Sequence, residues 1–375
     1  MTSTPRSLYI HIPFCRHRCG YCNFTLVAGR DDLIHAYLDA LEIEIGQRES
    51  PLELDTLFFG GGTPSHLNLQ QLERLFQIIR QSFHWNQQSE VSLEANPIDI
   101  TADKVALLSS LGVNRVSLGV QSFNDEKLKT LERDHDQAVA INAVNLLRPA
   151  MHSVSVDLIF ATPNETLATW KNDLETATSF DVNHVSTYGL TFEKGTAFWS
   201  RLLRSELNEA EEELQRDMYL LGIDHLTSHS LQHYEVSNFA KPGFQCRHNE
   251  AYWLGHPYFA YGAGAARYVE GKRETNHRST TTYIKKVMAG ESPTAESETL
   301  DPESLARERL VFGLRRMQGI ELTDFQQQTG YQVQELIQRK LEQYLEAKLL
   351  EIEQNHLRLT RAGLLVSDSI WPDFL

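Results

Sequence analysis

Residues 9–22 read YIHIPFCRHRCGYC, and this stretch decides how the chain is interpreted. Three of the chain's four cysteines lie in it with the spacing C-x3-C-x2-C: Cys15, Cys19 and Cys22. An apolar, β-branched run with Leu8, Ile10 and Ile12 leads into it, which predicts a buried strand followed by a cysteine-bearing loop. In parallel α/β sheets and barrels, the chemistry takes place at the carboxyl ends of the strands. The stretch therefore predicts a metal-binding loop at an active face.

The spacing favours an iron–sulfur cluster over zinc. Three thiolates can hold a four-iron cluster by three corners and leave one iron open to another ligand. Zinc normally needs a fourth protein ligand, for which His11 and His17 are the nearby candidates. A disulfide framework is disfavoured, because one short loop cannot pair three cysteines. The cysteines alone leave both metals open, with the cluster preferred.

Length and charge narrow the class of protein. The chain has 375 residues, enough for one large α/β domain and a smaller one. Its net charge of −15 argues against a general nucleic-acid or anionic-membrane surface, which needs a basic face. No apolar run approaches the ~18 residues of a membrane span, and the N-terminal residues lack the apolar core of a signal peptide. We therefore expect a cytoplasmic protein without nucleic-acid partners.

The first two-thirds of the chain alternates between strand and helix patterns. After the first strand, five more apolar runs read as strands: 54–59, 90–95, 113–120, 153–160 and 182–190. Between them, residues with a 3.6-residue apolar period predict helices: 31–47, 69–83, a helix capped by Thr101, 138–147 and 170–178. Six strand–helix units predict a parallel sheet with right-handed crossovers, in an α/β fold that forms a partial, laterally open (β/α)6 barrel. Polar and glycine residues follow the strands on one rim, as expected of an active face.

The rest of the chain divides into a connecting segment and a C-terminal domain. We assign 1–240 to the partial barrel, with a charged helix at 208–227 and a last strand at 234–239. Residues 241–292 form a segment that connects the barrel to the C-terminal domain. This segment contains a Gly/Ala-rich patch at 262–267 that permits close approach of a backbone or a planar ligand. Residues 293–375 show helices, a hairpin and a short final helix, which predict a mostly helical, winged-helix-like domain. This domain is not basic, so packing or a protein partner is favoured over nucleic acid.

Several ordered blocks resemble one known family. The cysteine motif with Tyr21 before its last cysteine resembles the signature of the radical S-adenosylmethionine (radical SAM) family. Further blocks are similar to its oxygen-independent coproporphyrinogen III oxidase-like branch, in the same order: LYIHIPFC at 8–15, GGGTPS at 60–65, LEANP at 93–97, GVQSF at 119–123, VDLI at 156–159 and the segment 359–370. The resemblance spans nearly the whole chain, so it is far more specific than the cysteine motif alone.

Within that branch, the chain looks more similar to the haem chaperones of the HemW type than to the oxidases. The oxidases carry a further cysteine two residues after the third cluster cysteine, where this chain has Phe24, and a longer N-terminal segment. Residues 248–253 read HNEAYW, which matches the HNxxYW motif associated with haem binding. The resemblance implies a haem chaperone without coproporphyrinogen III oxidase activity. That oxidase activity is the alternative, and a zinc-stabilised scaffold is the third interpretation.

The resemblance also implies roles for individual residues. Cys15, Cys19 and Cys22 would ligate a [4Fe–4S] cluster whose open iron binds S-adenosylmethionine. Gly61, Gly62 and Thr63 would line the methionine moiety, since glycine lets backbone groups reach a ligand. An electron from the cluster would cleave the sulfonium to a 5′-deoxyadenosyl radical, which is chemistry of the cofactor.

Other matching residues would surround the same cofactor. Glu94 and Gln121 would hold polar groups of the nucleoside, including ribose hydroxyls. Arg133 would bind an anion such as a carboxylate, and Asp157 would make a further ligand contact. Two tyrosines match positions near the cofactor: Tyr9 and Tyr21.

The HNxxYW motif does not by itself identify the residue that would bind the haem iron. His248 would bind haem directly only with an exposed ring nitrogen and a flat apolar pocket; otherwise it is a packed, hydrogen-bonded core residue. Cys246 is a rival thiolate ligand, or a small buried hydrophobic residue. The implied partners are haem-accepting proteins, respiratory ones among them, with transient contact to membrane proteins; the sequence leaves the oligomeric state open.

Overall fold

A twelve-stranded sheet organises the first 300 residues of the chain. The computed structural model describes residues 4–48 and 50–375. The strand order is β11-β12-β10-β9-β8-β7-β5-β1-β13-β14-β15-β16. The six strands of the predicted barrel are β1 (Ser7–Ile12), β5 (Thr56–Gly61), β7 (Glu90–Ala95), β8 (Arg115–Gln121), β9 (Ser153–Phe160) and β10 (His184–Gly189). They are parallel and follow one another in chain order, so the prediction of an open (β/α)6 sheet is confirmed.

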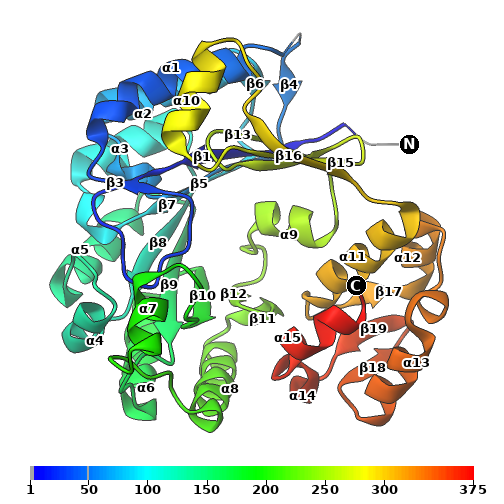
Figure 1. Cartoon of the computed structure of the whole chain (residues 1–375). Coiled ribbons are helices and arrows are strands. Elements are labelled where there is room, and N and C mark those ends of the chain that lie inside the picture. The colour runs from blue at the N-terminus through cyan, green and yellow to red at the C-terminus, as the bar shows by residue number, and fades with distance from the viewer. Residues whose placement is uncertain (1–3, 49) are drawn as a thin grey trace.

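Helices cover the outer side of this curved sheet (Figure 1). They are α1 (Ile34–Ile45), α2 (Leu69–Arg80), α3 (Ala102–Leu111), α4 (Asp125–Thr130), α5 (Gln137–Leu147) and α6 (Leu167–Ser179). The parallel strands are nearly continuous buried runs, as in β9. The predicted cap of α3 is present, since the Thr101 hydroxyl accepts the backbone N–H of Lys104 at 3.2 Å.

The sheet continues beyond β1 through a part of the chain in which no strands were predicted. β13 (Tyr258–Tyr261) pairs with β1 in parallel, and β14 (Ala266–Val269), β15 (Lys272–Asn276) and β16 (Thr294–Thr299) add antiparallel strands. The proposed division of the chain at 241 and 293 stays a prediction, although the structure places β16 in the large sheet. The expectation of one strand over 234–239 is wrong, because the chain turns between β11 (Gln232–Glu235) and β12 (Asn238–Ala240).

The C-terminal part forms a separate unit with its own core. It contains α11 (Pro302–Leu314), β17 (Ile320–Glu321), α12 (Leu322–Thr329), α13 (Val333–Glu346), β18 (Leu350–Glu353), β19 (His356–Leu359), α14 (Arg361–Leu364) and α15 (Ser367–Ile370). Its strands pair in the order β17-β19-β18. Buried Leu310, Leu314 and Leu357 share one apolar cluster. The helices and the small sheet agree with the predicted winged-helix-like domain, drawn orange to red in Figure 1.

The remaining elements complete the described chain. They are β2 (Phe14–Cys15), β3 (Val27–Ala28), β4 (Leu52–Glu53), β6 (Phe83–His84), α7 (Ala197–Leu203), α8 (Glu212–Ser228), α9 (Arg247–Trp253) and α10 (Thr280–Met288), with short 3₁₀ turns at Asp31–Leu33, Pro64–His66, Pro97–Asp99 and Trp371–Asp373. None of the helices within residues 4–48 and 50–375 has both the length and the apolar character to cross a membrane.

Candidate functional site

The cysteine loop leaves the carboxyl end of β1 and is held at both sides. The N–H of Cys22 donates to the carbonyl of Cys19 at 3.0 Å, which closes a tight turn. The N–H of Phe198, in α7, donates to the carbonyl of Gly20 at 2.9 Å. A side chain at Gly20 would collide with the Phe198 ring, because its Cβ would lie 2.4 Å from it. The close packing of α7 therefore fixes the path of the loop.

A cavity of about 530 Å³ opens beside this loop, and we call it the cysteine cavity. Among the residues that line it are ten that the sequence singled out: Cys15, Cys19, Tyr21, Cys22, Gly62, Thr63, Glu94, Gln121, Arg133 and Asp157. They lie on β1, β5, β7, β8 and β9 or in the segments that follow these strands, so the parallel topology brings together residues more than a hundred positions apart. The structure thus places them around a common space.

The glycines after β5 lie directly against the cysteine loop. Gly61 has φ +111°, and a Cβ there would lie 2.3 Å from the His11 ring. A Cβ on Gly62 would lie 2.7–2.9 Å from backbone atoms of the segment after β1. The N–H groups of Gly62 and Thr63 donate to that same segment at 2.8 Å. Only glycine permits this approach, which positions Thr63 so that its hydroxyl lies 2.9 Å from the Cys15 sulfur.

Arg133 places a positive charge next to the cysteines in the cysteine cavity. Its guanidinium donates to the sulfur of Cys19 at 3.4 Å and to the carbonyl of Gly119 at 2.9 Å. The buried Nε has no hydrogen-bond partner within the described residues. Burial opposes the charge, but the neighbouring Tyr21 and Cys19 outweigh it, and the pKa of Arg133 is raised. The side chain stays charged and keeps one donor free for an anion.

Two carboxyl groups face the cavity from β7 and β9, the strands on either side of β8. Glu94 accepts the N–H of Gly61 at 3.1 Å. Burial raises the pKa of Glu94 to about 7; the Gly61 N–H opposes this shift and the charge of Asp157 adds to it. Asp157 accepts hydrogen bonds from Ser117 at 2.8 Å and Ser155 at 3.0 Å. Burial is also the main reason why the pKa of Asp157 is raised. A polar group of a ligand in the cavity could hydrogen-bond to either carboxyl group and so reduce the free-energy cost of its burial.

Gln121 ends β8 in a strained conformation. Its φ is +68°, in the left-handed region, and the register of β8 against β9 shifts between Leu118 and Gln121. The following turn is anchored from α6, because the Asp173 carboxylate accepts the Ser122 hydroxyl at 2.8 Å and the Phe123 N–H at 2.7 Å. This anchor holds the strained residue at the cavity wall.

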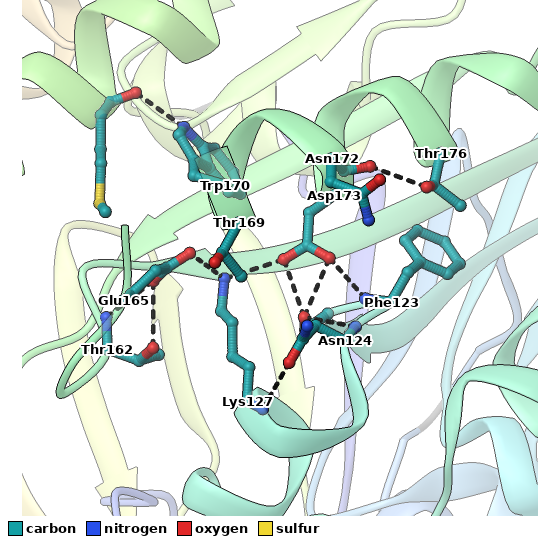
Figure 2. Close-up of polar contacts among 12 residues, drawn as sticks. Phe123, Asn124, Lys127, Thr162, Glu165, Thr169, Trp170, Asn172, Asp173 and Thr176 are labelled. Carbon is teal, nitrogen blue, oxygen red and sulfur yellow. Dashed lines mark hydrogen bonds and ion pairs between the residues drawn. The ribbon is translucent and has the colours of Figure 1, made fainter. Parts of the chain in front are cut away.

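The anchor belongs to a buried ion-pair network. Figure 2 shows Lys127 of α4 reaching between Glu165 and Asp173. The ammonium of Lys127 lies 2.9 Å from the Asp173 carboxylate, and the three side chains are at most 3% exposed. Glu165 also accepts the Thr162 N–H at 2.9 Å. The network ties together the segments that follow β8 and β9, behind the cysteine cavity.

The donor set of the cysteine cavity fits a cluster. Cys15, Cys19 and Cys22 are free thiols, and burial raises the pKa of Cys15 to about 12 without a metal. Within the described ranges, no three His, Cys, Asp or Glu side chains are gathered so that they could hold one metal ion. A four-iron cluster takes its thiolates on separate irons, so it does not need them to meet at one point. Arg133 beside Cys19 would offset the negative charge of the thiolates.

Tyr9 and Gly61 line a neighbouring space, the side cavity, of about 670 Å³. The Tyr9 hydroxyl lies 3.0 Å from Nδ1 of His11, whose Nε2–H donates to the carbonyl of Thr25 at 2.7 Å. Burial lowers the pKa of His11 to about 4, so the imidazole is neutral. Glu94 and Phe24 border both cavities, and the Phe24 side chain is exposed at their mouth.

His248 lies apart from the cysteines, in a third space of about 270 Å³ that we call the inner cavity. It is only 1% exposed. Its Nδ1 lies 2.8 Å from the Thr56 hydroxyl and its Nε2 lies 2.8 Å from the Tyr252 hydroxyl. Burial lowers its pKa to about 3. In this conformation both ring nitrogens are occupied, so direct haem ligation by His248 stays a prediction. Cys246 is also buried, with its pKa raised to about 12 by burial.

The sequence did not single out several residues that line these spaces. Ser117 and Tyr188 border both the cysteine cavity and the inner cavity. Their positions in the sequence could have identified them, since each lies on a predicted strand that ends at the rim. Arg278 lines the side cavity and donates to the Thr25 hydroxyl at 2.9 Å. Its place next to the cysteine loop depends on β13–β16 pairing with β1, for which the local sequence gave no indication.

Comparison with known proteins agrees with this architecture. Sequence profiles of the Radical SAM superfamily and the HemN C-terminal domain match residues 9–177 and 300–366. The protein named heme chaperone HemW from Lactococcus lactis is 35% identical, covering 100% of this chain and 98% of its own. The HemW of Bacillus subtilis is 33% identical, covering 99% of each. The structure of coproporphyrinogen III oxidase (HemN) from Escherichia coli superposes with a TM-score of 0.87 at 23% identity, over 99% of this chain and 90% of that one, and shows the common fold. The chain belongs to the radical SAM superfamily, in the HemN-like branch that includes proteins named HemW.

Proposed function

We propose that this protein is a haem chaperone that binds a [4Fe–4S] cluster, S-adenosylmethionine and haem, and delivers haem to other proteins. The observation that carries this proposal is the full-length similarity to proteins named heme chaperone HemW. Phe24 supports it, since an aromatic side chain stands where a cysteine of the oxidases is expected. The recipients would be haem-requiring proteins of the cytoplasm and, through transient contact, of the membrane, respiratory proteins among them.

In this proposal Cys15, Cys19 and Cys22 hold the cluster. Ligation requires thiolates, so each thiol would lose its proton as iron binds. Burial opposes that loss for Cys15 and Cys22, because it raises the pKa of both. The Arg133 cation favours it, and the iron itself supplies the larger share of compensating charge. When bound, the cluster and S-adenosylmethionine supply one-electron reductive chemistry.

The same cavity would hold S-adenosylmethionine by its polar ends. Gly61, Gly62 and Thr63 leave room for the methionine moiety beside the cluster. Arg133 offers its free donor to a carboxylate. Glu94 and Gln121 would meet the nucleoside and its hydroxyls, and Asp157 would make a further ligand contact. Tyr9 and Tyr21 would border the cofactor from either side of the loop.

Haem would bind through the region of the HNxxYW motif. We assign His248 a positioning role, because its ring is occupied by Thr56 and Tyr252. Its contribution would be to hold Tyr252 in place, and haem would contact the exposed side of that tyrosine and the neighbouring Trp253.

A haem titration combined with an oxidase assay tests the proposal. Anaerobic protein with a reconstituted cluster should give a saturable Soret band with haem and form no protoporphyrinogen from coproporphyrinogen III. Absence of a saturable spectral change would contradict the chaperone function. Robust turnover would instead establish the oxidase reaction, which the fold shared with HemN makes the second candidate. Metal analysis after anaerobic purification should find iron and sulfide; zinc alone would support a structural metal site.

A further inference from the structure

A small aromatic groove lies between the sheet and the C-terminal unit. It has a volume of about 220 Å³ and lies where α9, the segment into β13, strand β14 and α11 meet. Five aromatic side chains line it: Tyr252, Trp253, Tyr258, Tyr268 and Phe312. Two of them belong to the HNxxYW motif on α9. The groove shares no lining residue with the cysteine cavity.

The aromatic walls are held by ring–ring contacts. Tyr252 meets Tyr258 edge to face, with ring centroids 4.6 Å apart. Trp253 lies 6.3 Å from Phe312 of α11. The guanidinium of Arg315 covers the Trp253 ring at 4.6 Å. The indole N–H of Trp253 is buried and has no partner within the described residues. Such walls suit the flat face of an aromatic ligand.

The groove also carries positive charge that the protein does not neutralise. Arg309 lines it, and its buried Nε has no hydrogen-bond partner in the part of the chain that the structure describes. The one carboxylate in the groove, Glu308, is already bound by Arg273 through two contacts of 3.0 and 2.7 Å. His256 is exposed beside Arg309. An unpaired guanidinium next to an imidazole and flat aromatic walls is suited to a planar ligand with a carboxylate.

We propose that the aromatic groove binds the carboxylate-bearing edge of haem, with Arg309 and His256 holding a propionate and the aromatic side chains contacting the ring. This assignment rests on the proposed haem-chaperone function and locates the haem-binding site in the molecule. The groove is smaller than the ~300–1,000 Å³ of pockets that enclose a whole ligand, so only one edge enters and the rest of the macrocycle stays accessible. Accessible haem is what transfer to a recipient requires.

Tyr252 connects this groove to the buried motif histidine. Its ring forms a wall of the groove and of the inner cavity, and its hydroxyl is bonded to His248 at 2.8 Å. His248 in turn is fixed by Thr56 of β5. The motif therefore supports the groove from behind, and His248 affects haem binding without touching haem.

The experiment compares haem with its dimethyl ester, whose propionates carry no charge. We expect the wild-type protein to prefer haem, and Arg309→Leu to lose roughly 10–100-fold in affinity for haem but little for the ester, as loss of a charge-assisted hydrogen bond requires. Leu305→Trp, which fills the groove and keeps Arg309, should weaken both ligands. Arg339→Leu, at an exposed position of α13, is the matched control and should change neither affinity.

The outcomes separate this inference from the proposed function. If the wild-type protein binds haem and both groove variants bind it with unchanged affinity, the groove assignment is wrong and the chaperone function stands. If the wild-type protein does not bind haem, both are wrong. Circular dichroism and thermal unfolding of each variant establish that a lost affinity comes from the groove and not from unfolding.

Discussion

The cysteine cavity and the aromatic groove differ in how the chain presents its motif residues. In the cysteine cavity, all three motif cysteines and the basic Arg133 face a common space. At the groove, the motif histidine His248 is buried behind Tyr252, and the motif's two aromatic residues, Tyr252 and Trp253, line the groove. Residues of one motif can therefore line a cavity or support its wall from behind.

The largest expected effect is loss of the cluster. Cys19→Ala removes a thiolate that faces the cavity and lies 3.4 Å from Arg133. We expect almost complete loss of iron, sulfide and S-adenosylmethionine binding, because two thiolates cannot hold the cluster and the cofactor needs its open iron. Iron and sulfide analysis after anaerobic reconstitution measures this. Cys246→Ala is the control and should retain the cluster, since Cys246 lies in the inner cavity; equal loss in both variants would contradict the assignment.

A large effect on stability is expected behind the cysteine cavity. Asp173→Ala leaves Lys127 with one carboxylate partner and removes the acceptor of Ser122 and Phe123. Breaking such a buried pair should lower the free energy of unfolding by about 3–5 kcal/mol, measured by urea denaturation. Lys171→Ala, in an exposed ion pair with Glu175 on the same helix, should cost less than about 1 kcal/mol. Similar costs for both would show that the network contributes little.

A moderate, pH-dependent effect is expected at Glu94. Its pKa of about 7 exceeds the ordinary value of 4.5, so the folded protein binds this proton more tightly than the unfolded chain does. The resulting stability is full below about pH 4.5 and is lost as the pH rises through 7. Between pH 5.5 and 8, the ligand-free wild-type protein should lose about 2 kcal/mol relative to Glu94→Gln. Parallel thermal unfolding of both proteins measures it, and identical pH profiles would contradict the shift.

The smallest effect is expected at His248. His248→Gln should weaken haem binding by less than about tenfold and leave the wavelength of the Soret maximum unchanged, because the histidine supports Tyr252 and does not touch iron. Thr56→Val, which removes the partner of Nδ1, should have a similar effect. A shifted Soret maximum together with a loss above about a hundredfold would identify His248 as the iron ligand.

The sequence predicted the parallel half of the fold well, because its signals are local. The bounds of β7 and β9 agree with the predicted strands at 90–95 and 153–160, since each is a buried run bounded by turn residues. The polar residues of the rim could be predicted because they lie at or after the ends of these strands. In contrast, β13 and β14 have four residues each and β15 and β16 are largely polar. β13 is placed by pairing with β1, about 250 residues away, which no local pattern encodes.

The candidate sites show the same limit. The cysteines and Glu94 could be predicted because motif and strand end coincide. The sealed position of His248, the network of Lys127 and the unpaired Arg309 depend on contacts between distant segments, so only the structure revealed them. Burial of a polar side chain is decided by its tertiary partners, which residue type and spacing do not specify.

A haem titration of the variant with Cys15, Cys19 and Cys22 all replaced by alanine tests most directly whether the two regions serve different ligands. The cysteine cavity and the aromatic groove share no lining residue, so the variant should lose iron and sulfide yet bind haem with an affinity within about threefold of wild type. Loss of haem binding together with the cluster would contradict the account and place haem at the cysteines.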